Sequence, residues 1–275
     1  MRPVIVVPPT ASARPIVVEV PHAGVFIPPE VRAELALDDT GVKRDADLYV
    51  DRLYRDAAAL GATLVYTEIS RFVVDLNRAP DDVDAQSVPD HPSPRPDAPR
   101  GLIWRIATDG SQTLTAPLSL SSWQRRVTRY HAPYHTALDA AVAEVRARFG
   151  KVLILSGHSM PSVGKATHAD PGKRRADVVP GDLKGKTCDP RVTLAAISHF
   201  TAAGLSVSLN DPYLGGETTR RLGRPAEGLH ALQVELNRDL YYDESNFVIR
   251  EPGFSRLQSL CGELVDKLAG IAERL

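Results

Sequence analysis

Cysteine is scarce in this sequence, which contains two among 275 residues, Cys188 and Cys261. Two cysteines are too few for a disulfide framework, and their separation matches no cysteine-rich metal site. We therefore expect two reduced thiols, as is usual in a cytoplasmic protein.

An excess of charge and long apolar runs are also lacking. Lys and Arg together number 33 against 34 Asp and Glu, and no basic tract stands out. This balance gives no reason to expect nucleic acid or an acidic membrane surface as a partner. The apolar run at residues 4–7 is too short for a signal peptide or a membrane span. We therefore expect a local site for a small molecule, and the composition is compatible with a homo-oligomer.

What is present is an alternation of short β-branched runs with longer segments of helical spacing. Strands are predicted at residues 16–20, 62–67, 71–75, 152–155, 205–209 and 229–236. Helices are predicted at 45–60, 118–149 with a break or kink at Pro133, 190–203 and 254–275. The alternation predicts a single α/β domain over residues 1–275, with three layers (α/β/α) around a mixed, mostly parallel sheet. Segments at about 79–100 and 162–190 are predicted to be long loops.

Two histidines follow predicted strands and stand beside glycines. His22 comes after the strand at 16–20, and His158 comes after the strand at 152–155. Ligands of such sheets bind at the carboxyl ends of strands, so both rings could reach a common point. A catalytic zinc site uses two or three such nitrogens, a carboxylate and one open position. The nearby Arg-Asp-Ala-Asp segment offers Asp47 as the ligand and Asp45 as its support, although both could instead cap a helix.

Two further segments carry groups that bind anions. Asn77 and Arg78 stand side by side after a predicted strand, where a guanidinium and an amide make a carboxylate clamp. The alternative is a surface ion pair with the acidic loop that follows. Arg220 comes shortly after the Gly215-Gly216 pair and could be a second anion contact, or part of a plain turn.

Glu235 is a carboxylate in an otherwise apolar predicted strand. A buried charge is costly unless it is paired or used, so Glu235 is a candidate general base, or else half of a buried ion pair.

A serine-hydrolase interpretation competes for the same segment. Residues 157–161 approximate the G-x-S-x-G turn. Ser159 would be the nucleophile, Asp211 the orienting carboxylate and His230 the base, and this chain order is a permitted one. However, Pro161 replaces the second glycine, and no glycine-rich oxyanion loop precedes the turn. We therefore favour His158 as the functional residue and Ser159 as a group that orients it.

The order of these blocks resembles the N-formylglutamate amidohydrolase family. The similar segments run from about Val18 to Tyr242 and read PHAG, RDAD, SRFVVDLNRAP, YHAPYH, SGHSMPS and GGETTRRLGRPAEGLHALQVELNRDLY. The resemblance implies hydrolysis of N-formyl-L-glutamate to formate and L-glutamate in histidine degradation. It also implies a relation to zinc carboxypeptidases and aspartoacylase-type deacylases, with their mixed sheet flanked by helices.

The resemblance carries roles onto matching positions. It places substrate-carboxylate binding on Asn77 and Arg78, matches the strand glutamate of the relatives to Glu235, and matches the two histidines. One position departs from the pattern, because Val25 stands where the relatives usually have a glutamate. Asp47 as the carboxylate ligand is therefore inferred from this sequence alone.

The predicted reaction combines these roles. A divalent metal, with zinc expected, is held by the two histidines and Asp47, and Glu235 takes a proton from activated water. Arg78 or His230 stabilises the oxyanion, and Arg220 with Asn77 or Arg78 anchors the carboxylates of an acidic N-acyl amino acid. The alternatives are a metal-dependent deacylase of another N-acyl amino acid or short peptide, and a non-catalytic module that binds acidic amino acids.

Overall fold

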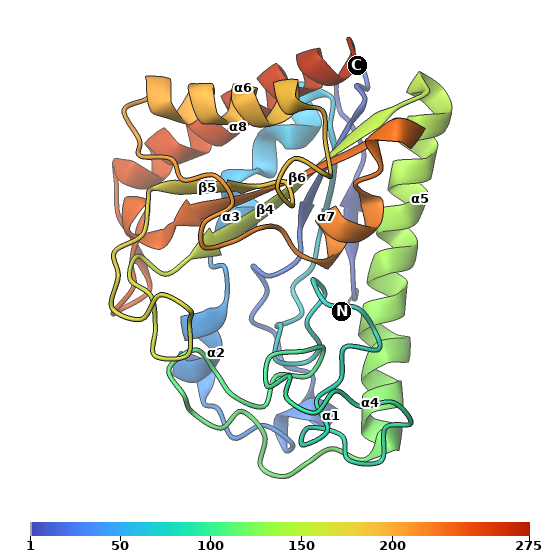
Figure 1. The fold of residues 1–275 in the computed structure, drawn as a ribbon, viewed down its shortest axis with the longest axis vertical. Helices are drawn as coiled ribbons and strands as arrows, with labels where there is room; N and C mark the ends of the chain where they lie inside the picture. The colour runs from blue at the N-terminus through green and yellow to red at the C-terminus, as the bar shows by residue number, and fades with distance from the viewer. Residues whose placement is uncertain (1) are drawn as a thin grey trace.

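A six-stranded mixed sheet forms the centre of the molecule in the computed structural model, which describes residues 2–275 (Figure 1). The strand order is β1-β3-β2-β4-β6-β5, with β3, β2, β4 and β6 parallel and the edge strands β1 and β5 antiparallel to their neighbours. The strands are β1 (Ile5–Val7), β2 (Ile16–Val20), β3 (Thr63–Tyr66), β4 (Val152–Met160), β5 (Val178–Gly181) and β6 (Leu229–Asn237). A separate ribbon pairs β7 (Tyr242–Asp243) with β8 (Val248–Ile249).

Helices cover both faces of this sheet. The helices α5 and α7 pack on one face, and α3, α6 and α8 pack on the other (Figure 1). The helices are α1 (Pro29–Arg32), α2 (Asp39–Asp45), α3 (Val50–Leu53), α4 (Leu120–Arg126), α5 (Ala132–Phe149), α6 (Pro190–Ala202), α7 (Glu217–Leu222) and α8 (Gly253–Ala272). Short 3₁₀ turns lie at Arg55–Leu60, Pro225–Glu227 and Arg238–Leu240. Two apolar clusters fill the two interfaces, so the predicted three-layer arrangement is confirmed.

The predicted strand at 71–75 is wrong, because this segment forms turns. Phe72, Val73 and Val74 are apolar and buried, which gave the strand pattern, but side chains and loops take the place of a neighbouring strand. The Arg126 side chain donates to the carbonyls of Phe72 and Val73 at 3.2 and 3.0 Å, and the Asp75 N–H donates to the Leu102 carbonyl. The backbone is therefore satisfied without a sheet partner.

Other boundaries differ as well. The segment 205–209 is not a strand, and only Val207 makes an isolated bridge, to Val178. That bridge lies at β5, a strand inside the segment 162–190 that was predicted to be a loop. The helix predicted from residue 45 is instead α2, ending at Asp45, followed by α3 and a 3₁₀ turn.

Pro133 does not interrupt the long helix. A π-helical turn at Val127–His131 joins α4 to α5, and the proline stands in the first turn of α5. The proline stands directly after the π-turn, in which the Ala132 N–H bonds back to the Val127 carbonyl, and this wider turn accommodates a residue that lacks an N–H and would clash in a regular α-helix.

The α5 face of the sheet changes character along its strands. Alternate residues of a strand point to the same face, so the apolar Val152 and Ile154 of β4 share a face with Ser156 and His158. In the same way, Leu229 and Ala231 of β6 are followed on that face by Gln233 and Glu235. In the register of the two strands, Ser156 lies opposite Gln233, and His158 lies opposite Glu235. The carboxyl halves of two adjacent parallel strands therefore present a polar surface beyond the apolar core.

Candidate active site

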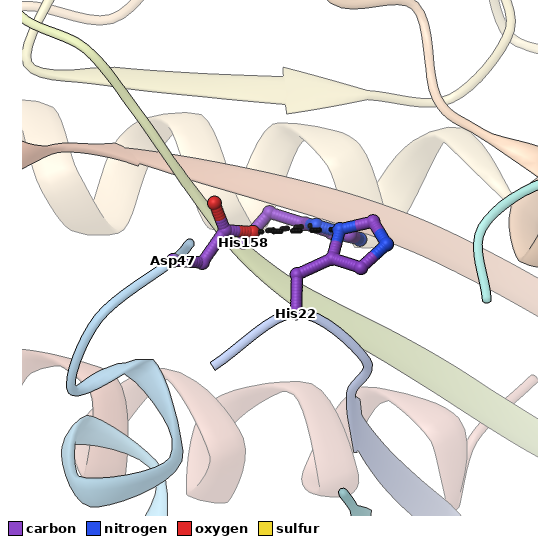
Figure 2. Close-up of side chains that lie close together, drawn as sticks. All are labelled: His22, Asp47 and His158. Carbon is purple, nitrogen blue, oxygen red and sulfur yellow. Dashed lines mark hydrogen bonds and ion pairs between the residues drawn. The ribbon is translucent and has the colours of Figure 1, made fainter. Parts of the chain in front are cut away.

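A buried cluster of two imidazoles and one carboxylate lies at the carboxyl end of the sheet. His22, Asp47 and His158 each offer a ligand atom, and these atoms lie within 4.8 Å of one another (Figure 2). Asp47 Oδ2 is 3.0 Å from His158 Nδ1 and 3.7 Å from His22 Nδ1. The three side chains are 1–2% exposed. The chain thus brings together the three residues that were predicted as metal ligands.

Three separate segments supply these groups. His22 follows β2, and Asp47 lies between α2 and α3, where its N–H donates to the His22 carbonyl at 2.9 Å. His158 lies inside β4, which runs to Met160, so it does not follow the strand as predicted. The neighbouring Gly157 faces Tyr54 on the other side of the sheet, where an added Cβ would come within 2.5 Å of the ring.

Each member of the cluster has a polar partner that orients it. His22 Nε2 donates to Asp75 Oδ1 at 2.9 Å, which leaves a lone pair on Nδ1, and Arg71 Nη2 donates to it at 2.9 Å. Ser156 Oγ lies 3.1 Å from His158 Nε2. Arg238, itself buried, donates from Nη2 to Asp47 Oδ1 at 3.1 Å. Such supporting contacts fix ring and carboxylate orientation at metal sites.

The electrostatics favour the charged carboxylate. Burial would raise the pKa of Asp47, but the hydrogen bond from His158 and the charge of Arg71 outweigh it and hold the pKa well below its ordinary value. Burial likewise opposes ionisation of Asp75, whose pKa is nevertheless held low by the charges of His22 and Arg71. Both carboxylates therefore stay anionic.

The donor set fits a divalent metal. Ligand atoms of a tetrahedral zinc site lie roughly 3.3 Å apart, and two nitrogens with one carboxylate oxygen leave a fourth position open. The separations of 3.0 and 3.7 Å to Asp47 Oδ2 are close to that value. Asp45 does not join this set, because its carboxylate accepts hydrogen bonds from the Thr108 backbone N–H at 3.0 Å and from the Thr108 hydroxyl.

The cluster opens into a cavity of about 630 Å³ that Glu235 also lines. Glu235 pairs in register with His158, on the same face of the sheet. Its Oε1 accepts a hydrogen bond from Gln233 Nε2 at 2.9 Å. Burial raises the pKa of Glu235, against the opposing charge of His158. A buried carboxyl with a raised pKa beside a metal site suits proton transfer.

Asn77 and Arg78 both line this cavity. Asn77 Oδ1 accepts from the Thr218 N–H at 3.1 Å, which turns Nδ2 toward Gln233 Oε1 at 3.2 Å and His158 Nε2 at 3.3 Å. This close approach needs Gly216, because a Cβ there would lie 2.1 Å from Asn77 Nδ2.

Two predicted residues lie elsewhere. His230 is near the start of β6, five residues before Glu235 and thus about 16 Å away along the strand. Its Nδ1 accepts a hydrogen bond from the Asp189 N–H, and the residue does not line the cavity. The structure therefore does not place His230 where an oxyanion donor would have to lie. Arg220 is exposed, pairs with Glu217 at 2.6 Å and lines a neighbouring groove that Asn77 and Arg78 also line, so its role as an anion contact beside them stays a prediction.

The serine-hydrolase arrangement is not assembled either. Ser159 Oγ accepts from Arg238 Nε at 3.2 Å, and Asp211 is exposed and does not line the cavity. With His230 near the far end of β6, neither the predicted base nor the predicted orienting carboxylate accompanies the hydroxyl.

The sequence reasoning missed Arg71. Its Nη2 lies 2.9 Å from His22 Nδ1 and 3.2 Å from Asp75 Oδ2, and its guanidinium carbon lies 4.5 Å from the centre of the Trp104 ring. The sequence does show Arg71 directly before the apolar residues that precede Asp75. The predicted strand, however, did not indicate that the Arg71 side chain points into the site.

Comparisons with known proteins identify the family of this chain. Residues 14–242 match the family model described as N-formylglutamate amidohydrolase. This chain belongs to the N-formylglutamate amidohydrolase family. It is 32% identical to N-formylglutamate deformylase of Pseudomonas aeruginosa over 92% of each chain, and 31% identical to that of Pseudomonas putida over the same shares.

A solved structure of the family shares the whole architecture. The N-formylglutamate amidohydrolase from Ralstonia eutropha JMP134 superposes with a TM-score of 0.90 at 31% identity, covering 100% of this chain and 99% of the other. The predicted family and the predicted amide-bond hydrolase are thus confirmed. Within residues 2–275, no helix is both long and apolar enough to span a membrane.

Proposed function

We propose that this enzyme hydrolyses N-formyl-L-glutamate to formate and L-glutamate in a metal-dependent reaction. The observation that carries the proposal is the placement of Glu235 opposite His158 in one cavity with His22 and Asp47. The names of the Pseudomonas relatives support the substrate.

His22, Asp47 and His158 would hold the metal, with zinc as the expected ion. When bound, a zinc ion supplies Lewis-acid chemistry, which acidifies water and polarises a carbonyl. The chain supplies the remaining functions through its own side chains.

Glu235 moves the proton. As a buried carboxylate it takes a proton from the attacking water, whose oxygen bonds to the formyl carbon. It then returns that proton to the amine nitrogen as the C–N bond breaks. The raised pKa of Glu235, caused by burial, favours holding the proton between the two steps.

Arg71 replaces Arg78 and His230 as the donor for the developing negative charge. Its guanidinium lies against His22 Nδ1 and is fixed by Asp75 and Trp104. With a metal on His22 Nδ1, Arg71 Nη2 would lose that acceptor and be free to donate to an oxyanion, while Asp75 keeps the guanidinium in place. Asn77 and Arg78, farther along the same segment, bind a substrate carboxylate.

The cellular setting follows from the same proposal. Release of glutamate from its N-formyl derivative places the reaction in histidine degradation. The two cysteines, Cys188 and Cys261, are free and buried, which is compatible with a reducing cytoplasm.

The test measures metal content and formate together. The purified protein is stripped with a chelator and reloaded with zinc, and formate release from N-formyl-L-glutamate is compared with acetate release from N-acetyl-L-glutamate. We expect formate release that needs the metal. Release of acetate alone would assign the enzyme to another acyl group, and metal-independent formate release would contradict the proposed chemistry.

A further inference from the structure

The cavity is lined by more cations than its own carboxylates neutralise. Five of its arginines have an aspartate within 4.0 Å: Arg71, Arg78, Arg95, Arg175 and Arg238. A sixth, Arg100, forms no ion pair with any residue in the described range 2–275.

Arg100 is held in place by neutral groups. Its Nη2 donates to the Thr167 carbonyl at 2.6 Å, and its guanidinium carbon lies 6.0 Å from the centre of the Trp104 ring. Burial, together with the nearby charges of Arg78 and Arg71, lowers the pKa of Arg100 despite opposing effects of Tyr213 and Asp45. A partly buried guanidinium with one carbonyl partner retains several donors for an anion.

Arg100 lies near Arg78 on one side and near Arg71 on the other. Its own carbonyl accepts from Arg78 Nε at 3.0 Å, so the two cationic residues are neighbours. On the other side, the Arg71 guanidinium that contacts His22 lies over the same Trp104 ring. Arg100 therefore stands within the cavity beside the predicted carboxylate clamp and close to the catalytic groups.

We propose that Arg100 binds the side-chain carboxylate of the substrate and so selects N-acyl amino acids with acidic side chains. This inference rests on the proposed function and deepens it. Asn77 and Arg78 hold one carboxylate, and Arg100 holds the other. A molecule with two carboxylates thus fits a cavity with two adjacent cationic contacts, whereas a neutral side chain leaves the Arg100 charge unpaired.

The test compares R100M with R95M. Arg95 lines the same cavity, is exposed and pairs with Asp82, so its removal deletes the same charge without the proposed contact. For each protein, kcat/KM is measured with N-formyl-L-glutamate and with N-formyl-L-glutamine, which has a neutral amide in place of the carboxylate.

We expect R100M to lose about 100-fold in kcat/KM for N-formyl-L-glutamate and to change less than about threefold for N-formyl-L-glutamine. R95M should keep the wild-type ratio between the two substrates. An R100K variant should recover part of the selectivity, because it restores the charge without the planar fork. Equal losses on both substrates in R100M, or no loss on N-formyl-L-glutamate, would overturn the inference.

Failure of the proposed function would be visible separately. If the metal-loaded wild type released no formate from either substrate, calorimetry of L-glutamate and L-glutamine binding would still test Arg100. A preference of the wild type for glutamate that R100M abolishes would support the inference, and an unchanged preference would overturn it.

Discussion

Glu235 shows how a single residue depends on its surroundings. An isolated glutamate in an apolar strand could be a buried ion-pair partner, but its register opposite His158 and its place in the cavity favour proton transfer. The neutral amide of Gln233 is its side-chain hydrogen-bond partner, so no cation neutralises it through that contact.

Replacing Glu235 with Gln should separate metal binding from turnover. E235Q keeps the size of the side chain but cannot accept a proton, so kcat should fall about 100-fold or more. Zinc content by elemental analysis should stay at the wild-type level. Full activity in E235Q would remove the general base from the mechanism.

Arg238 is a second residue whose role comes from its contacts. It donates to Asp47 Oδ1, to Ser159 Oγ and to the Arg44 carbonyl, and it is fully enclosed. We expect R238M to weaken zinc affinity about 10- to 100-fold, because the ligand carboxylate loses the group that orients it.

Competition against a chromophoric chelator measures this affinity. The matched control is R174M, since Arg174 is exposed, pairs with Asp239 and does not line the cavity. Thermal unfolding separates a loss of affinity from a loss of fold. Unchanged affinity in a folded R238M would refute the positioning role.

At the scale of elements, the strands β2, β4 and β6 were predicted well because each is a short apolar run buried on both faces. The end of β4 was predicted too early, at residue 155, because the polar Ser156 and His158 are typical of a loop although they continue the strand. The segment 71–75 failed for the opposite reason, since its apolar residues are buried against Arg126 instead of a sheet. Such replacements depend on distant residues and cannot be read from a local pattern.

The Arg126 contact gives a prediction about pH. Burial would raise the pKa of Glu34, but hydrogen bonds from Arg126 and Ser122 lower it below its ordinary value. A carboxyl with a lowered folded pKa adds stability above its unfolded pKa of about 4.3, and this contribution is lost as pH falls through the folded value.

The variant E34Q should therefore be less stable than the wild type at pH 7, by about 1–2 kcal/mol. The difference should shrink below about pH 4, where the wild-type carboxyl becomes neutral as well. Urea unfolding at pH 7 and at low pH measures both values. A constant difference across this range would contradict the lowered pKa.

At the scale of the whole molecule, the site is assembled from segments far apart in the chain. The proposed ligands come from residues 22, 47 and 158, and the long loops contribute cavity-lining residues such as Arg100 and His168. The sequence indicated which residue types carry the chemistry, since histidines and carboxylates near strand ends are recognisable. It misplaced His230 and missed Arg71, because side-chain direction depends on packing that no periodicity encodes.

The central claim is that His22, Asp47 and His158 hold one divalent metal. Anomalous diffraction at the zinc absorption edge, from crystals of the zinc-loaded protein, tests it directly. The account predicts one strong peak about 2.0–2.2 Å from His22 Nδ1, His158 Nδ1 and an Asp47 carboxylate oxygen. A peak elsewhere, or none in the cavity, would contradict it.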